Sequence, residues 1–186
     1  MSKLSELIAE LCPDGVEYKR LGDVAELLKG VQLNKSNMND EGSYPVINGG
    51  ISPLGYVEQY NFDENTITIS QGGASAGYVN FLTTKFWAGA HCYVLKPYDI
   101  VLNRYIYHFV KANETKLQEC QYGAGIPALA KKTVSDLPIP IPPLAIQAEI
   151  VRILDNFTKL TAELTARKKQ YEYYRDKLLT FKQKEV

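Results

Sequence analysis

The sequence lacks the residue patterns on which most enzyme active sites and metal sites depend. HExxH does not occur, and the glycine-rich stretch 70–77 has no Lys-Ser/Thr ending of a phosphate-binding loop. Histidines and cysteines are few, and none of them has the spacing of metal ligands; they are His91, His108, Cys12, Cys92 and Cys120. We therefore expect neither a catalytic residue nor a metal site, and we interpret residues 70–77 as a hairpin loop.

The cysteines are also odd in number and far apart, which argues against a disulfide framework. We expect reduced and mostly buried thiols in a cytoplasmic protein. His91 falls in an apolar and aromatic run, so we expect it to be a hydrogen-bonded residue of the core.

Long apolar runs and net charge are absent as well. No window approaches about 18 uncharged apolar residues, and Glu6 and Glu10 interrupt the first apolar stretch, so we expect neither a membrane helix nor a secretory signal. The 21 basic and 21 acidic residues cancel, but unevenly: the net charge is −6 over residues 1–64, +3 over 65–143 and +3 over 144–186. An anion is therefore expected to bind to the middle or the tail.

The first three quarters of the chain contain short periodic segments. Apolar residues at helical spacing predict helices over 3–11 and 102–110, while alternation or β-branched runs predict strands over 66–70, 78–81, 91–95 and 137–141. Residues 21–28 fit either a short helix or the start of a strand. Because no regular βαβ alternation occurs, the pattern favours an α+β fold.

The tail predicts one long helix. It has no glycine or proline after Pro143, so we expect the helix to begin near Pro142 or Pro143. Its seam positions alternate in steps of three and four, which is a heptad pattern; they are Ile150, Ile153, Phe157, Leu160, Leu164, Arg167, Tyr171, Tyr174, Leu178 and Phe181. A helix of about 39 residues would be about 58 Å long, more than the domain can cover. We therefore favour a coiled coil with a second helix over a helix folded back on its own domain.

Arg167 is the one polar residue of this seam. A single polar seam residue can fix register or partner choice at a cost in stability. Alternatively, its long stem passes along the seam and carries the charge to water. Glu163 stands four residues earlier and can pair with it on the same helix.

Polar side chains in the predicted loops are candidates for contacts with nucleic acid. Asn and Gln can read adenine edges, and Lys can reach guanine or phosphate. The candidate base-contacting residues are Asn34, Lys35, Asn37, Gln71, Ser75, Gln121 and Tyr122, and the candidate phosphate contacts are Lys131 and Lys132. Such residues are also common in loops that bind no nucleic acid.

The block that joins the domain to the tail resembles a known family. Residues 137–164 are similar to the end of a target-recognition domain and the start of the conserved spacer helix in type I restriction–modification specificity (S) subunits. The shared features are an alternating strand, Pro142-Pro143-Leu144, Gln147 and Leu154-Asp155, with weaker similarity over 16–24, 44–48 and 123–129. One departure is Ile146, where the family usually has Glu.

The resemblance implies a DNA target-recognition domain over residues 1–143 and a long coiled-coil spacer and dimerisation helix over 144–186. Family members usually carry two of each, so this chain resembles a half-length subunit. A homodimer with antiparallel helices would rebuild the full arrangement and read an interrupted palindrome in double-stranded DNA.

The resemblance also implies partners and a division of labour. Modification methyltransferase subunits would dock on the dimer, bind S-adenosylmethionine and methylate adenine N6, and a restriction or translocase subunit can join them. The chain itself would need no cofactor and would not be an enzyme. Two other interpretations stay open: a dimeric DNA-binding regulatory or specificity-swapping fragment without methyltransferase subunits, and a coiled-coil scaffold protein.

Overall fold

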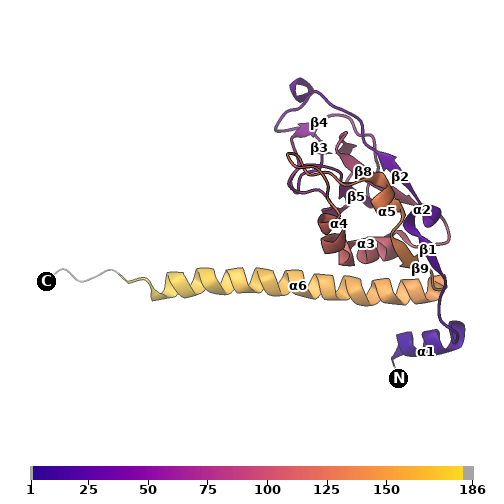
Figure 1. Ribbon diagram of the computed structural model, residues 1–186. Coiled ribbons are helices and arrows are strands. Elements are labelled where there is room, and N and C mark those ends of the chain that lie inside the picture. The colour runs from indigo at the N-terminus through magenta and orange to yellow at the C-terminus, as the bar shows by residue number, and fades with distance from the viewer. Residues whose placement is uncertain (1, 182–186) are drawn as a thin grey trace.

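A helix of 36 residues, α6 (Leu144–Leu179), projects from an α+β domain in the computed structural model, which describes residues 2–181 (Figure 1). Pro143 is its N-cap, as the sequence predicts. The helix is about 54 Å long at 1.5 Å per residue. It ends earlier than the predicted range 144–186, so Phe181 lies beyond its last turn and residues 182–186 lie outside the described part.

A four-stranded antiparallel sheet forms the centre of the domain, in the order β2-β8-β5-β6. Its strands are β2 (Ala25–Lys29), β5 (Thr66–Ser70), β6 (Val79–Leu82) and β8 (Cys92–Pro97). A second sheet, in the order β4-β3-β7, lies at the end of the domain far from α6 (Figure 1). It consists of β3 (Tyr44–Ile47), β4 (Tyr56–Val57) and β7 (Trp87–Ala88). A third, two-stranded sheet pairs β1 (Tyr18–Arg20) with β9 (Pro138–Pro140) close to the start of α6.

The core lies between the four-stranded sheet and the helices that cover one face of it. Alternation in β5 leaves Ile67 and Ile69 fully buried, and α3 (Asn103–Ala112) buries Ile106 and Val110 against them. The remaining short helices are α1 (Lys3–Leu11), α2 (Leu21–Val24), η1 (Lys35–Asn37), α4 (Glu114–Glu119) and α5 (Lys131–Ser135). The ambiguous segment 21–28 therefore contains both a helical turn and a strand.

Gln147 joins α6 to the domain. Its side chain is fully buried, and its Oε1 accepts a hydrogen bond from the Leu102 N–H at 2.8 Å. Its Nε2 donates to the carbonyl oxygens of Pro142 at 2.8 Å and Ile100 at 3.3 Å. The first turn of α6 is thereby held to the start of α3, although the two segments are about 45 residues apart in the chain.

Asp155 forms a second attachment two turns further along α6. Its carboxylate is paired with Arg104 and lies 2.7 Å from Nε2 of His108, both on α3. Partial burial opposes ionisation, but the hydrogen bonds from Arg104 and His108 hold the pKa of Asp155 below its usual value. From residue 156 to residue 181 every side chain is exposed, so α6 does not fold back on its own domain.

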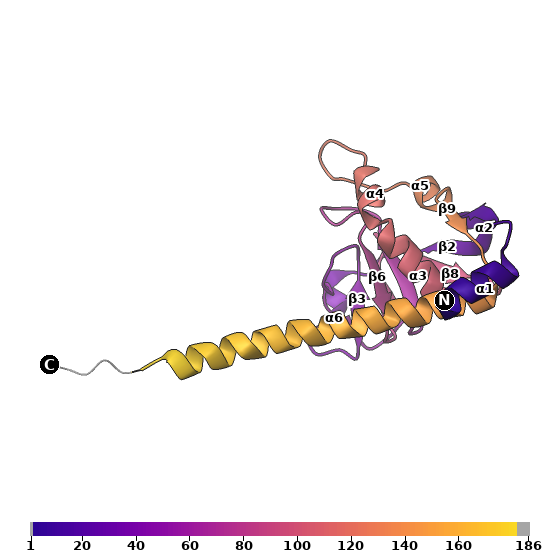
Figure 2. The same cartoon turned by 90° about the horizontal axis from the view of Figure 1, so that it is seen from below.

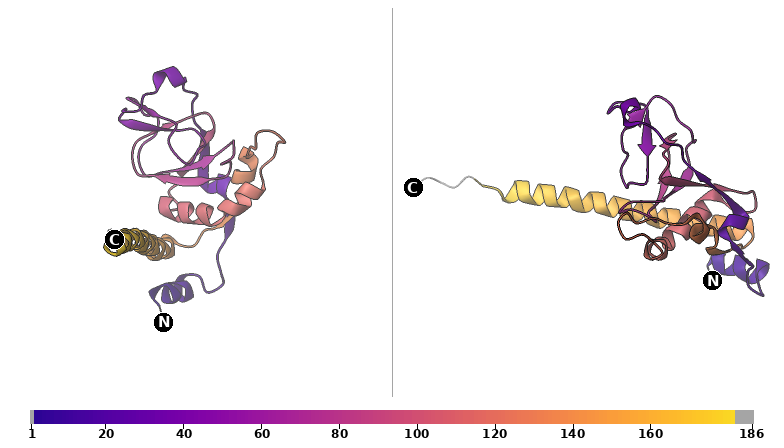
Figure 3. Two further views of the ribbon diagram at one scale, coloured as in Figure 1. Left: turned by 90° about the vertical axis from the view of Figure 1, so that its left-hand side faces the viewer. Right: turned by 45° about the horizontal axis from the view of Figure 1, so that its top comes forward.

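The N-terminal helix α1 packs beside the first turns of α6, on the side away from the sheets (Figure 3). None of its residues is buried. Lys3 Nζ lies 3.3 Å from Glu149 Oε2, and Arg152 donates to the same carboxylate at 2.6 Å. Hydrogen bonds from Arg152 and Lys3 lower the pKa of Glu149 to about 2.

Two sequence-based predictions are wrong. His91 is exposed rather than part of the core, because it lies in the turn before β8, where its N–H bonds to Asn48 Oδ1 at 3.0 Å. Only one of the three cysteines is buried: Cys92 in β8 is, and burial raises the pKa of its thiol to about 12, whereas Cys12 is half-buried. Cys120 is exposed because it ends the short surface helix α4. None of the helices within residues 2–181 is long and apolar enough to cross a membrane.

Replacing Gln147 by Ala should destabilise the whole domain. The substitution leaves the Leu102 N–H and the Pro142 carbonyl without their partners in a buried place. Each such group costs about 1–3 kcal/mol, so we expect the free energy of unfolding to fall by about 3 kcal/mol in urea denaturation. Gln170→Ala, on the exposed part of α6, is the matched control and should change stability by less than about 0.5 kcal/mol. Similar small losses for both variants would contradict the assigned role of Gln147.

Candidate nucleic-acid interface and helix face

Two loops that are far apart in the sequence form one surface, which we call the joined loops (residues 71–77 and 121–129). The Gly73 N–H donates to the Pro127 carbonyl at 2.9 Å, and the Leu129 N–H donates to the Gln71 carbonyl at 2.7 Å. The first loop connects β5 to β6 as the predicted hairpin, and the second projects from the domain after α4 (Figure 2). The structure thus brings together four of the predicted DNA-contacting residues; they are Gln71, Ser75, Gln121 and Tyr122.

Within the joined loops, both glutamines are directed at the protein itself. Gln121 Nε2 donates to the Ala76 carbonyl at 2.6 Å. Gln71 Oε1 is buried and has no hydrogen-bond partner within residues 2–181. Ser75 is half-buried, whereas Tyr122 is 57% exposed. Tyr122 therefore has the largest exposed side chain of the four. The contact of these four residues with DNA stays a prediction.

The predicted residues Asn34, Lys35 and Asn37 belong to a different part of the domain. They lie at η1 and are all exposed. Asn37 lines a small cavity together with Val57 of β4 and Trp87 of β7. These three predicted residues therefore lie with the second sheet rather than with the joined loops.

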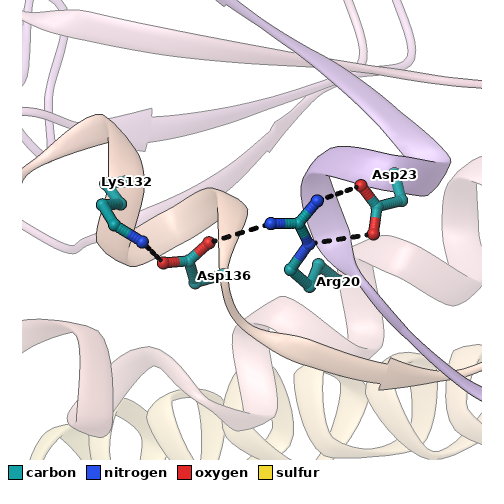
Figure 4. Close-up of polar contacts among 4 residues, drawn as sticks. All are labelled: Arg20, Asp23, Lys132 and Asp136. Atoms are coloured by element: carbon teal, nitrogen blue, oxygen red, sulfur yellow. Dashed lines mark hydrogen bonds and ion pairs between the residues drawn. The ribbon is translucent and has the colours of Figure 1, made fainter.

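The two lysines predicted to contact phosphate differ in their surroundings, although both are exposed on α5. Lys132 is paired with Asp136, and Asp136 lies 3.9 Å from Nη1 of Arg20, which in turn binds Asp23 through two nitrogens (Figure 4). The charges along this row alternate and largely cancel. Lys131 forms no ion pair within residues 2–181 and lies two residues after the joined loops, so it is the freer cation of the two.

The seam of α6 is an exposed apolar stripe. Its apolar positions beyond the domain are between 50% and 69% exposed; they are Phe157, Leu160, Leu164, Tyr171, Tyr174 and Leu178. The first two seam positions, Ile150 and Ile153, are half-buried, and Ile150 lines a cavity of about 350 Å³ together with Ile8 of α1. The open part of the seam therefore begins at Phe157. A continuous apolar surface of this kind is typical of an interface.

Arg167 lies within this stripe and pairs with its own helix. Its Nη2 is 3.1 Å from Glu163 Oε1, one turn earlier, which confirms the predicted pairing. Both side chains are more than half exposed, so the pair adds little to the stability of a single chain.

Sequence reasoning missed two groups of side chains. His108 has no carboxylate at ligand spacing along the chain, yet Asp155, 47 residues later, binds it in space. The cavity beneath η1 combines residues of three separate segments, 33–39, 57–59 and Trp87, and no local pattern indicates it. Both groups depend on the packing of distant elements.

Comparison with known proteins gives consistent matches over the domain and the helix. A family model for the type I restriction modification DNA specificity domain matches residues 13–171. A putative type I restriction enzyme specificity subunit of Haemophilus influenzae is 35% identical, with 88% of this chain and 46% of the relative covered. The specificity subunit of the type I restriction enzyme EcoR124I/EcoR124II from Escherichia coli is 35% identical, with coverage of 100% and 50%.

The fold is shared with a solved structure. The crystal structure of a type I restriction–modification S subunit from M. genitalium matches with a TM-score of 0.72 at 24% identity, over 88% of this chain and 45% of that chain. The present chain spans about half the length of the curated relatives it matches.

Proposed function

Because the chain belongs to the type I restriction modification DNA specificity domain family, we propose that it recognises a DNA sequence on behalf of a type I restriction–modification enzyme. The observation that carries this proposal is the extent of the family match, which takes in both the domain and most of α6. The joined loops and Lys131 support it, since they offer an exposed aromatic ring and a free cation on one surface. The protein would work in the cytoplasm, where its DNA target lies.

A second copy of the chain is the partner that best fits the open seam. The seam from Phe157 to Leu178 has a length of about 33 Å along the helix axis and is not covered by its own domain. A two-fold dimer places identical apolar stripes face to face and closes the assembly. If the two helices run antiparallel, the two domains lie at opposite ends of the helix pair, where they do not collide.

The charge distribution along α6 favours an antiparallel pair. The second half of the helix, residues 162–179, has five basic and three acidic residues and a net charge of +2, whereas residues 144–161 have two of each and are neutral. A parallel pair would set the two positive halves side by side. An antiparallel pair sets each positive half against the neutral half of the other helix, which lowers the repulsion.

Such a dimer would read two inverted copies of a half-site, because its two domains are related by a two-fold axis. The helix pair separates the domains by several tens of ångströms, so a gap of uncontacted base pairs lies between the half-sites. One turn of DNA measures about 34 Å, which allows both domains to approach the same side of the duplex.

Catalysis would belong to partner subunits. Modification methyltransferase subunits would bind S-adenosylmethionine and take the target adenine out of the stack to methylate N6. A restriction subunit would complete the enzyme in systems that cut DNA. This chain would position those subunits at a particular DNA sequence. That role requires recognition of bases and a defined spacing of the two domains, but no catalytic residue.

The dimer proposal predicts that charge in the seam separates the chains. In the double variant Leu160→Asp and Leu164→Asp, pairing would bury two carboxylates per chain without partners, which is strongly unfavourable. Light scattering at micromolar concentration should therefore show the mass of a dimer for the wild type and half that mass for the variant. The matched control, Ala162→Asp and Ala166→Asp on the other side of α6, should remain dimeric. A monomeric wild type would contradict the proposal.

The two lysines of α5 should differ in their effect on DNA binding. Lys131→Ala should weaken binding to every duplex sequence alike and reduce the slope of log affinity against log salt by about 1. Lys132→Ala should have a smaller effect, because Asp136 already neutralises that charge. Titrations of labelled duplexes at several salt concentrations measure both slopes. An unchanged slope in the Lys131 variant would show that this residue does not contact DNA.

The experiment that tests the function as a whole is methylome sequencing of cells that carry the chain and a methyltransferase partner. We expect a methylated motif of two inverted half-sites with a fixed spacer and an adenine in each half. A cell that lacks the chain but keeps the methyltransferase is the control, and it should lose the motif. An asymmetric or uninterrupted motif would contradict the homodimer, and no motif at all would favour a regulatory fragment that acts without methyltransferase subunits.

A further inference from the structure

The N-terminal helix α1 covers the beginning of the seam that lies open further along α6 (Figure 3). Lys3 Nζ lies 3.3 Å from Glu149 Oε2, and Ile8 lines a cavity together with Ile150, the first seam position. Ile150 also packs against the domain core, and Ile153, the next seam position, is half-buried. A second helix can therefore reach the seam only beyond these two positions.

The open part of the seam is symmetric about the level of Lys169. In an antiparallel pair of identical helices, residues that lie equally far from the two-fold axis face each other, because both helices rise by about 1.5 Å per residue. With the axis at Lys169, every open seam position therefore faces another open seam position of the partner. Leu160 faces Leu178, Leu164 faces Tyr174, Arg167 faces Tyr171, and Phe157 is level with Phe181, just beyond the last turn of the partner's helix.

A shift by one heptad in either direction loses this correspondence. If the axis lay between residues 165 and 166, the partner's Leu178 would be level with Ile153, and the chain that follows it would run into α1. If the axis lay between residues 172 and 173, Phe157 and Leu160 would face no residue of the partner's α6. Of the three registers, only the one centred on Lys169 uses the whole open seam without displacing α1.

The charged residues also fit this register. Arg167 faces the partner's Tyr171, so its guanidinium can lie over the ring in a cation–π contact. Its Nη2 meanwhile keeps the pair with Glu163 at 3.1 Å. Glu163 comes within two residues of the level of the partner's Lys177 on the same flank, where opposite charges attract. Lys168 approaches its own copy on the other flank, but both side chains are exposed to solvent, which screens their repulsion.

We propose that two copies of the chain pair in this one register, with the two-fold axis at Lys169, and that α1 fixes the register by occupying the start of the seam. The inference rests on the proposed homodimer and adds which side chains meet across it. It gives Arg167 a contact across the interface instead of a path past it into water. A shift by one heptad moves one helix along the other by about 10.5 Å, so the register also fixes the separation of the two domains.

Distances between spin labels test the register. Three exposed residues occupy the same heptad position on the outer side of α6; they are Ala162, Lys169 and Asp176. Each is replaced by Cys in turn and labelled in the full chain, in which Cys12 and Cys120 are first changed to Ser. Cys92 is buried and therefore does not take the label. Because the three sites share one heptad position, their label distances within a dimer differ only through their axial distance from the two-fold axis.

The three distances measured by double electron–electron resonance identify the arrangement. We expect the shortest distance at position 169, and two equal and longer distances at positions 162 and 176, where the labels lie about 21 Å apart along the axis. A shift by one heptad would make the distance at 169 equal to that at one of the other two positions, which would overturn the register and leave the dimer in place. Three equal distances would indicate a parallel pair, and no dipolar distance would indicate a monomer. Either of these results would reject the antiparallel homodimer itself.

Detaching α1 tests the cause of the register. Leu4 and Leu7 are the half-buried residues of α1, and none of its residues is fully buried, so Leu4→Asp and Leu7→Asp together should release α1 and leave the domain folded. The first two seam positions then become available to the partner, which lengthens the paired seam. We expect a population shifted by one heptad, in which the axial separation grows to about 32 Å at position 176 and falls to about 10.5 Å at position 162.

The matched control places the same two charges on the opposite side of α1. Ser5→Asp and Ala9→Asp lie on its exposed face and should keep the distances of the wild type. Wild-type distances in the Leu4 and Leu7 variant as well would overturn the role of α1, because the register would then be fixed without it.

Discussion

The attachment of α6 to the domain through Gln147 is the interaction on which the architecture depends. An unpaired polar group costs about 1–3 kcal/mol when it is buried, and the fully buried amide of Gln147 avoids this cost by bringing the start of α3 and the Pro142 carbonyl to one point. The pairing of Asp155 with Arg104 and His108 then sets the direction of the helix two turns later. With both attachments in place, the remaining two thirds of α6 have to point away from the domain.

The exposed seam follows from this geometry. The domain covers α6 only as far as Asp155, and α1 covers a further side of its first turns, so the apolar stripe from Phe157 onward has no cover within its own chain. An exposed apolar stripe of this kind is typical of an interaction surface. The geometry that orients the helix therefore also leaves the stripe open, and the two-fold dimer proposed above would cover it.

The domain separates its candidate binding features into two regions. The joined loops and Lys131 belong to the end of the four-stranded sheet, whereas η1 and the Trp87 cavity belong to the second sheet. The predicted DNA-contacting residues are therefore divided between two separate surfaces of the domain. Several polar side chains that could contact DNA, among them Gln121 and Lys132, already have partners within the protein.

Local periodicity and the prolines near the helix boundary were enough to predict the α+β class, the strand 66–70, the helix start near Pro142 or Pro143 and the heptad seam. It also indicated the family, through a block of residues around the start of α6. Other features could be read only from the packed domain: His91 is exposed, Gln71 and Gln121 face the protein, and Asp155 meets His108. Those outcomes depend on contacts between segments tens of residues apart, where composition and spacing carry no information. The cavity around Trp87 belongs to the same class, since it exists only where η1, β4 and β7 meet.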